Sequence, residues 1–360
     1  MAPEIKLRVG GKEYAGWKTA RVMRGIESVS GSFALGVSER WGTQAQPWPI
    51  YEEDECTVLI GSETVITGWV DRRSPSYGAK DHALAVSGRD ATGALVDCSA
   101  VLDQWEFRNV SVLAFARKVC EPFGIEVSLQ TGLVLPPSPR KISVSPGDTA
   151  FNAIERACRL AGVLPVSDGE GGLLLTRAGD THATTALVEG ENILSASAEF
   201  DASGRFHDYF VLGQHRGSSE FFGASATTEI KAFAEDPNVS RVARSLLIRP
   251  EGNVTLKQAA TRAHWEAATR AARADSVSVT VQGWTQGGGT LWPINVLVRV
   301  KSPAIGVNGD MLITQATYAV DASGGTTTEL TLKPPDAFLP EAVALTVAAT
   351  GLWKEIRHGV

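Results

Sequence analysis

The segment KLRVGGKEYA, residues 6–15, opens the stretch of sequence that decides the fold, and TVLIGSETVITGWVDRR, residues 57–73, repeats its design. In the first segment, Gly10 and Gly11 separate two short runs and tolerate the positive φ angles of a tight hairpin turn. In the second, residues 61–63 separate two runs in which apolar and polar side chains alternate. Residues 32–37 and 82–87 alternate in the same way. These four signals predict a small antiparallel barrel or sandwich.

The apolar pattern changes to helical spacing after Cys98. Residues 109–124 predict a helix with Asn109 or Ser111 as the N-cap and Gly124 as the stop. Residues 148–162 predict a second helix of the same design, and a short alternating run follows each helix. The two helix-then-strand units resemble each other weakly, and a proline-containing connector separates them. We expect them to lie side by side in one small α/β module.

Alternating runs return from Leu187 onward, and one helix interrupts them. Thr255 and Gln258 form a capping box, with Val254 placed to pack on Ala259. The helix presents mostly small side chains on one face, at Leu256, Ala260, Ala263, Ala267 and Ala274. We expect this face to pack on the chain's own barrel, with contact to another subunit as the alternative.

These patterns predict a mixed, β-rich α+β protein with two antiparallel β-barrel domains and a small α/β module between them. The expected domains are a first barrel over residues 1–100, the α/β module over 101–180, a second barrel with one inserted helix over 181–340, and a C-terminal tail over 341–360. A length of 360 residues agrees with several domains.

Composition and charge narrow the function. A net charge of −6 argues against nucleic acid as the main ligand, because binding phosphates requires clustered Lys and Arg. The first residues lack a secretory signal, and no segment is apolar enough to span a bilayer, so synthesis in the cytosol is expected. The four cysteines, Cys56, Cys98, Cys120 and Cys158, are interpreted as reduced core thiols.

No local motif predicts catalysis, a cofactor or a metal. The six histidines lack zinc-ligand spacing, and the sequence has no GxSxG elbow. The run Glu52-Glu53-Asp54-Glu55 is interpreted as a solvated entry to a strand. A cell-wall hydrolase would need a pair of carboxylates for which the sequence offers no motif.

Nine tryptophans leave two hypotheses open besides core packing. They could anchor subunit interfaces, where Trp and Arg concentrate. They could also serve as stacking platforms of a carbohydrate or peptidoglycan-binding module, for which Trp48 and Trp105 are the residues to replace.

Several motifs stand out in order along the chain. They are YAGW at residues 14–17, IESVSGSF at 26–33, GWVD at 68–71, VSGRDATGALVDC at 86–98, Gly283-Trp284 with GTLWP at 289–293, and PPDAFL at 334–339. Together they resemble the baseplate hub proteins of Mu-like contractile phage tails. Ser87-Gly88-Arg89-Asp90 is the most specific part, and the resemblance covers residues 5 to 340 in order.

The resemblance implies a structural protein of the virion tail baseplate that is assembled in the bacterial cytoplasm. It implies a homotrimer in which two similar barrels per subunit form a pseudo-sixfold ring. Such a ring joins the sixfold tail tube and other baseplate proteins to a threefold membrane-piercing spike. Hubs of type VI-like injection systems share this architecture and are the alternative. Gly68-Trp69 and Gly283-Trp284 are a faint sign that the two barrels are related.

The residues after Pro340 fall outside the resemblance, and three of them alternate like a strand. We expect this tail to dock on a neighbouring subunit or on the spike, which assembly after truncation at Pro340 would test. The candidate interface residues are Trp41, Trp48, Trp105, Arg262, Arg270, Arg273, Val343, Leu345 and Val347.

Overall fold

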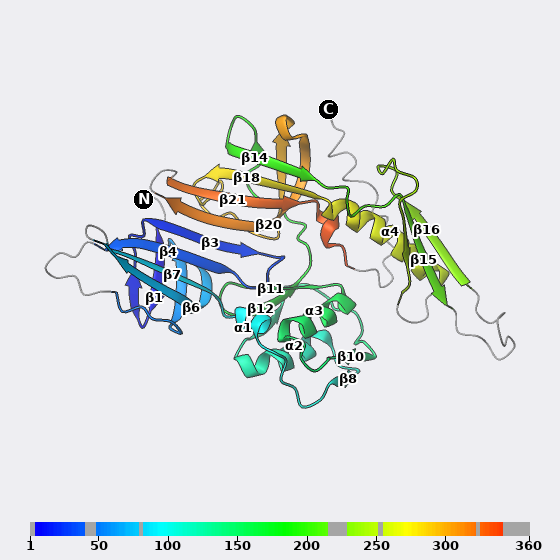
Figure 1. Cartoon of the computed structure of the whole chain (residues 1–360), viewed down its shortest axis with the longest axis horizontal. Helices are drawn as coiled ribbons and strands as arrows, with labels where there is room; N and C mark the ends of the chain where they lie inside the picture. Colours follow the sequence, from blue (N-terminus) through cyan, green and yellow to red (C-terminus); the bar gives the residue numbers. More distant parts are fainter. Residues whose placement is uncertain are drawn as a thin grey trace.

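One long antiparallel sheet runs through most of the molecule (Figure 1). The computed structural model describes residues 4–39, 48–78, 82–214, 229–250, 255–321 and 325–340. The first set of strands is β1 (Ile5–Val9), β2 (Lys12–Tyr14), β3 (Thr19–Gly25), β4 (Ser32–Glu39), β5 (Glu55–Ile60), β6 (Glu63–Tyr77) and β7 (His82–Asp90). The second set is β13 (Leu187–Val188), β14 (Ile193–Phe200), β18 (Asp275–Gln282), β19 (Leu297–Ser302), β20 (Val307–Asp321) and β21 (Gly325–Lys333).

Both predicted N-terminal hairpins are confirmed. β1 pairs with β2 across Gly10 and Gly11, and β5 pairs with β6 across Gly61. Both first glycines have the positive φ that this turn requires, 55° at Gly10 and 64° at Gly61.

The prediction of two separate barrels is wrong in one respect: the two sets of strands form one 13-stranded sheet, and the described residues contain no closed barrel. The sets join where β20 pairs with β3, from Gln315 opposite Gly25 to Val320 opposite Ala20. Because β3 offers its free edge to β20, the exposed backbone groups are satisfied by the other set of strands. The β-rich architecture and its antiparallel pairing are confirmed.

A strand order that repeats within the sheet divides it into two equivalent modules. In sheet order, β14-β18-β21-β20 is followed directly by β3-β4-β7-β6. If the four strands of each set are numbered in chain order, both sets lie in the sheet in the order first, second, fourth, third. Corresponding strands run in the same direction. The lengths agree too: 8, 8, 9 and 15 residues against 7, 8, 9 and 15. Outside this order, β19 pairs with β20 just as β5 pairs with β6.

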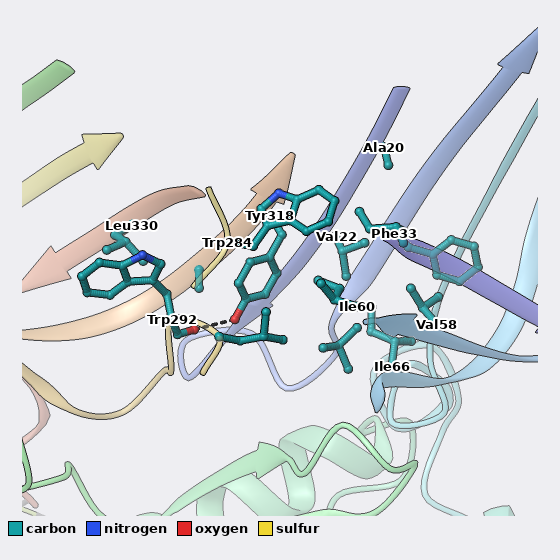
Figure 2. Close-up of a cluster of buried hydrophobic side chains, with 14 of the residues drawn as sticks. Ala20, Val22, Phe33, Val58, Ile60, Ile66, Trp284, Trp292, Tyr318 and Leu330 are labelled. Carbon is teal, nitrogen blue, oxygen red and sulfur yellow. Dashed lines mark hydrogen bonds between the residues drawn. The ribbon is translucent and has the colours of Figure 1, made fainter. Parts of the chain in front are cut away.

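One hydrophobic core extends across the junction of the two modules (Figure 2). Val22 of β3 lies opposite Tyr318 of β20, and both side chains are buried. The Tyr318 hydroxyl donates a hydrogen bond to the carbonyl of Trp292, which is buried in the same core. The shared core joins the two modules into one packed body.

The α/β module lies beneath the sheet in Figure 1 and has its own core. Its elements are α1 (Gly93–Asp97), β8 (Glu106–Arg108), α2 (Val112–Cys120), the short 3-10 helix η1 (Glu121–Phe123), β9 (Val127–Leu129), β10 (Lys141–Ser143), α3 (Ala150–Ala161), β11 (Leu164–Ser167) and β12 (Leu173–Thr176). Ser111 caps α2, Thr149 caps α3, and left-handed Gly162 ends α3. Both predicted helix-then-strand units are confirmed, and β9 and β11 flank β12 in one small sheet.

An insertion between β14 and β18 forms a third unit. It contains β15 (Asp208–Gln214), β16 (Glu229–Glu235), β17 (Ser245–Ile248) and α4 (Leu256–Arg273). The capping box at Thr255 and Gln258 is confirmed, whereas Val254 lies outside the described residues. Ala259, Ala263 and Ala267 pack on the β15–β17 sheet. The expectation that α4 covers the second barrel is therefore wrong, because a separate small sheet covers its alanine face.

Two further short 3-10 helices are η3 (Pro303–Ile305) and η4 (Pro335–Phe338). No helix in the described part of the chain is long and apolar enough to cross a membrane. Cys56, Cys120 and Cys158 are buried, and burial raises the pKa of each thiol to about 12. Cys98 is exposed, which corrects its assignment to the core, because it caps α1 at the surface.

Candidate functional site

The segment 86–98 forms the connection between the first sheet module and the α/β module. Gly88 of β7 permits the close approach of β6, since a Cβ atom there would lie 2.0 Å from the carbonyl oxygen of Trp69 and 2.8 Å from the ring of Phe33. Gly68 stands in the same crowded region, and its added Cβ would lie 2.0 Å from the carbonyl oxygen of Arg89. β6 and β7 can therefore pair this closely only with glycine at both positions.

Arg89 pairs with one acid from the sheet and one from α1. Its Nε lies 2.8 Å from Asp71, and its Nη2 lies 2.6 Å from Asp97. These hydrogen bonds raise the pKa of Arg89 and lower that of Asp97. The pairs are half exposed, so they orient α1 on the sheet and contribute little to stability.

Asp90 connects the sheet with the α/β module from the inside. Its side chain accepts hydrogen bonds from the amide and hydroxyl of Thr92, at 3.1 and 3.0 Å, and from the hydroxyl of Ser167 on β11, at 2.6 Å. Asp90 is only 2% exposed, and burial raises the pKa of its carboxyl against the opposing effect of these hydrogen bonds. The motif therefore fixes the relative position of two domains.

We expect Asp90→Ala to lower the free energy of unfolding by about 3 kcal/mol, because it leaves buried donors without acceptors. Asp90→Asn keeps the shape and an acceptor, so it should cost less. The raised pKa means that the ionised carboxyl opposes folding at neutral pH, and this cost disappears as the pH falls through the folded-state value toward 3.8. The wild type should therefore gain stability relative to Asp90→Asn on acidification in urea titrations. A constant difference between pH 7 and 4 would contradict this assignment.

The structure places the predicted interface tryptophans in different surroundings. Trp48 packs against Tyr14 and Trp17, with ring centroids 5.1 and 5.0 Å apart, at the edge of the main core. Trp105 is 41% exposed on the α/β module. The remaining apolar candidates, Trp41, Val343, Leu345 and Val347, lie outside the described residues. The carbohydrate hypothesis for Trp48 and Trp105 stays a prediction.

The three predicted interface arginines all lie on α4, on either side of buried Glu266. Arg262 and Arg270 each lie 2.8 Å from a carboxylate oxygen of Glu266. Arg273 donates from Nε to the carbonyl oxygen of Ala337 at 3.1 Å. The helix thus holds a row of guanidinium groups beside the segment that leads to Pro340.

The sheet has a long edge strand, β14, and a strand, β6, that is open along part of its length, and the sequence indicated neither. β14 forms the outer edge of the second module, where Leu194 is 56% and Phe200 is 40% exposed. β6 pairs with β7 along its C-terminal half, and within the described ranges no strand pairs with the other side of residues 72–77. Exposed strand edges of this kind invite pairing with another chain.

In the part of the chain that the structure describes, no group of three or more His, Cys, Asp or Glu side chains could hold a metal ion. A repeated sheet with open edges, joined to a second packed module, is typical of a structural protein that forms assemblies. Comparisons with known proteins agree with this class.

Three family models match the chain. Residues 4–90 match the N-terminal domain of Mu phage baseplate assembly protein GpP-like, residues 92–177 match the second domain of baseplate hub protein gp44-like, and residues 255–341 match the fourth domain of Mu phage baseplate assembly protein GpP. The baseplate hub protein gp44 of Escherichia phage Mu is 32% identical over 94% of this chain and 90% of its own length. The chain therefore belongs to the family of Mu-like phage baseplate hub proteins.

Solved structures show the same fold. The 43 kDa tail protein of prophage MuSo2 from Shewanella oneidensis is 34% identical, with a TM-score of 0.82 over 94% of this chain and 99% of that one. The E. coli c3393 protein, a component of the type VI secretion system, is 9% identical, with a TM-score of 0.54 over 95% of this chain and 80% of that one. At this low identity the second likeness concerns the fold alone.

Proposed function

We propose that three copies of this chain form a closed ring at the centre of a phage tail baseplate, where the ring adapts the sixfold tail tube to a threefold membrane-piercing spike. The role is mechanical and non-enzymatic, and assembly takes place in the bacterial host cytoplasm. The observation that carries the proposal is the repeated strand order of the sheet. Two equivalent modules in each of three copies present six similar units to the tube, whereas the whole chains keep threefold symmetry.

The junction inside one chain provides a template for the junction between chains. Within the chain, the C-terminal half of β20 pairs with β3. β6 corresponds to β20, and β14 corresponds to β3, so the same pairing would join β6 of one copy to β14 of the next. Both edges are open in the described chain, and their strands run antiparallel in this arrangement. A head-to-tail contact of this kind closes into a ring when the rotation per copy fits.

The bulges in the two long strands fix the expected register. β20 has its bulge between Ile313 and Gln315, and β6 has its bulge between Val70 and Arg72. Ser76 lies as many residues after the bulge of β6 as Ala319 lies after the bulge of β20, so the two residues hold equivalent positions. Following the paired residues across each module shows that Ser197 of β14 is equivalent to Arg21 of β3. Ala319 lies directly opposite Arg21 in the internal junction. Ser76 should therefore lie opposite Ser197 of the neighbouring copy.

Side chains on these edges suit an interface. Tyr77 is 86% exposed on β6, and Phe200 is 40% exposed on β14. Ring closure would cover both side chains. Their aromatic character suits this position, because aromatic side chains are enriched at protein interfaces. A ring that withstands sheath contraction needs obligate interfaces of about 2,000 Å² or more, so the α/β modules and the C-terminal tail are expected to add contact area.

Disulfide trapping tests this arrangement. In a Cys98→Ser background, Ser76→Cys combined with Ser197→Cys should give a covalent trimer on mild oxidation, because directly opposite Cβ atoms lie about 5 Å apart. Either single substitution should leave the chain monomeric in denaturing electrophoresis. The matched control, Ser74→Cys with Ser197→Cys, is displaced by two residues and should cross-link poorly. Equal cross-linking of the two pairs, or products no larger than dimers, would contradict the proposed ring.

A further inference from the structure

A pocket of about 390 Å³ lies where the α/β module, α4 and the segment from η4 to Pro340 meet. Four arginines from separate places in the sequence line it: Arg159 of α3, Arg177 after β12, and Arg262 and Arg273 of α4. Glu155 of α3 also lines the pocket, and apolar side chains, including Trp265 and Phe338, form much of the remaining wall. In Figure 1, helix α4 lies above the α3 region of the module.

The pocket walls are held by specific contacts. The indole Nε1 of Trp265 donates a hydrogen bond to the carbonyl oxygen of Leu339 at 3.0 Å. The guanidinium of Arg262 lies over the Trp265 ring, 4.9 Å from its centroid. At the end of α3, a Cβ atom added to Gly162 would lie 2.5 Å from Cβ of Pro340. The C-terminal segment is thus packed directly on the module, and the pocket has a defined shape.

The positive charge of the pocket is only partly compensated. Arg159 lies 2.8 Å from Glu155, and Arg262 lies 2.8 Å from Glu266. Arg177 donates to the carbonyl oxygen of Gly162 at 3.2 Å, and neither Arg177 nor Arg273 forms an ion pair with any residue of the described ranges.

Loss of hydration lowers the pKa of Arg273. The charges of Glu266 and Glu27 oppose this effect, and those of Arg270 and Arg159 add to it. The lining contains four arginines and one glutamate, so positive charge is in excess here in a chain of net charge −6.

The lining indicates the chemistry of the ligand. A small inorganic anion is usually held by several donors that converge on one point, often backbone amides. Here the guanidinium groups are distributed around an apolar wall, and the volume is within the range of pockets that take ligands larger than a single ion. A ligand that carries several separated carboxylates on a partly apolar backbone fits this arrangement, since Arg binds carboxylates through charge-assisted hydrogen bonds.

We propose that this pocket binds an acidic peptide segment of a partner protein, with side-chain carboxylates at Arg177 and Arg273 and the peptide chain against Trp265 and Phe338. All of the lining residues belong to one chain, so the site does not depend on the ring. It adds a docking point for a protein partner beside the edges that join identical copies.

Fluorescence anisotropy of labelled tetraglutamate with the full chain at low salt tests this inference. We expect saturable binding of one peptide per chain, at least tenfold weaker in Arg177→Gln, and no binding of labelled tetralysine. The matched control is Arg108→Gln, an exposed arginine on β8 outside the pocket, which should keep the wild-type affinity. Unchanged thermal unfolding of Arg177→Gln will confirm that the variant is folded.

Three outcomes would overturn the inference. Equal weakening by Arg177→Gln and Arg108→Gln would show nonspecific attraction to surface charge. Displacement of the peptide by an equal concentration of inorganic pyrophosphate would assign the pocket to small anions. Binding that requires removal of residues 341–360 would make the chain's own tail the occupant. None of these outcomes affects disulfide trapping of the ring, so the two proposals fail independently.

Discussion

Proline at one of two neighbouring positions of β14, Ser197 or Ala198, will convert the proposed ring into a folded monomer. Successive N–H groups along a strand point to opposite neighbours, so one of these two residues donates to β18 and the other faces the open edge. Proline removes the donor. At the outward position it eliminates at least about 1 kcal/mol of hydrogen bonding at each of three junctions, which weakens the ring about a hundredfold.

Each of the two proline variants serves as the control for the other. The outward-facing proline should keep the unfolding midpoint that the wild type shows when it is diluted to a monomer, while light scattering reports a monomer. The other proline breaks the ladder between β14 and β18 and should lower the unfolding midpoint as well. If both variants stay folded and trimeric, β14 does not carry the contact between copies.

Gly88→Ala will have the largest effect on the stability of the single chain. The added Cβ would lie 2.0 Å from the carbonyl oxygen of Trp69, a backbone atom that cannot move without breaking the pairing of β6 with β7. Overpacking costs about 1–3 kcal/mol where side chains can relax, and a backbone obstacle should bring the loss to at least about 3 kcal/mol. Urea unfolding of the purified chain measures this loss.

Gly204→Ala is the matched control, because nothing lies within 4 Å of its added Cβ. It should change the free energy of unfolding by no more than about 0.5 kcal/mol. A Gly88→Ala variant that is as stable as Gly204→Ala would show that β6 and β7 do not pair as closely as described.

Local sequence signals were sufficient for the individual elements. Gly10-Gly11 and Gly61 predicted the hairpins. Ser111, one of the two expected caps of the first helix, and Thr255 each begin a helix. These features depend on residues a few positions apart, where turn and capping chemistry act directly. The resemblance to baseplate hubs also rested on short motifs, and the comparisons confirm it.

The continuous sheet could not be predicted, because its central contact joins residues that are far apart in the sequence. Val22 and Tyr318 lie opposite each other, yet alternation reports only which face of a strand is buried and not which strand is its neighbour. The insertion between β14 and β18 also concealed the repeat of the modules. Gly68-Trp69 lies within β6, whereas Gly283-Trp284 follows β18, which corresponds to β4. This pair therefore did not mark equivalent positions.

The candidate site was predicted only in part. Arginines on α4 were named from the sequence, but Arg159 and Arg177 were not, because only the fold brings them to the same pocket. The open edges carry no residue signature, since backbone groups form them. The exposure of apolar side chains on such an edge, as at Leu194 on β14, is visible only in the structure.

Cryo-electron microscopy of the purified protein at high concentration and low salt will show whether the two open edges pair between copies. We predict a closed ring of three copies in which β14 of each copy pairs with β6 of the next, so that six similar sheet modules surround one axis. A monomer, or a ring in which the β14 edge faces solvent, would contradict it.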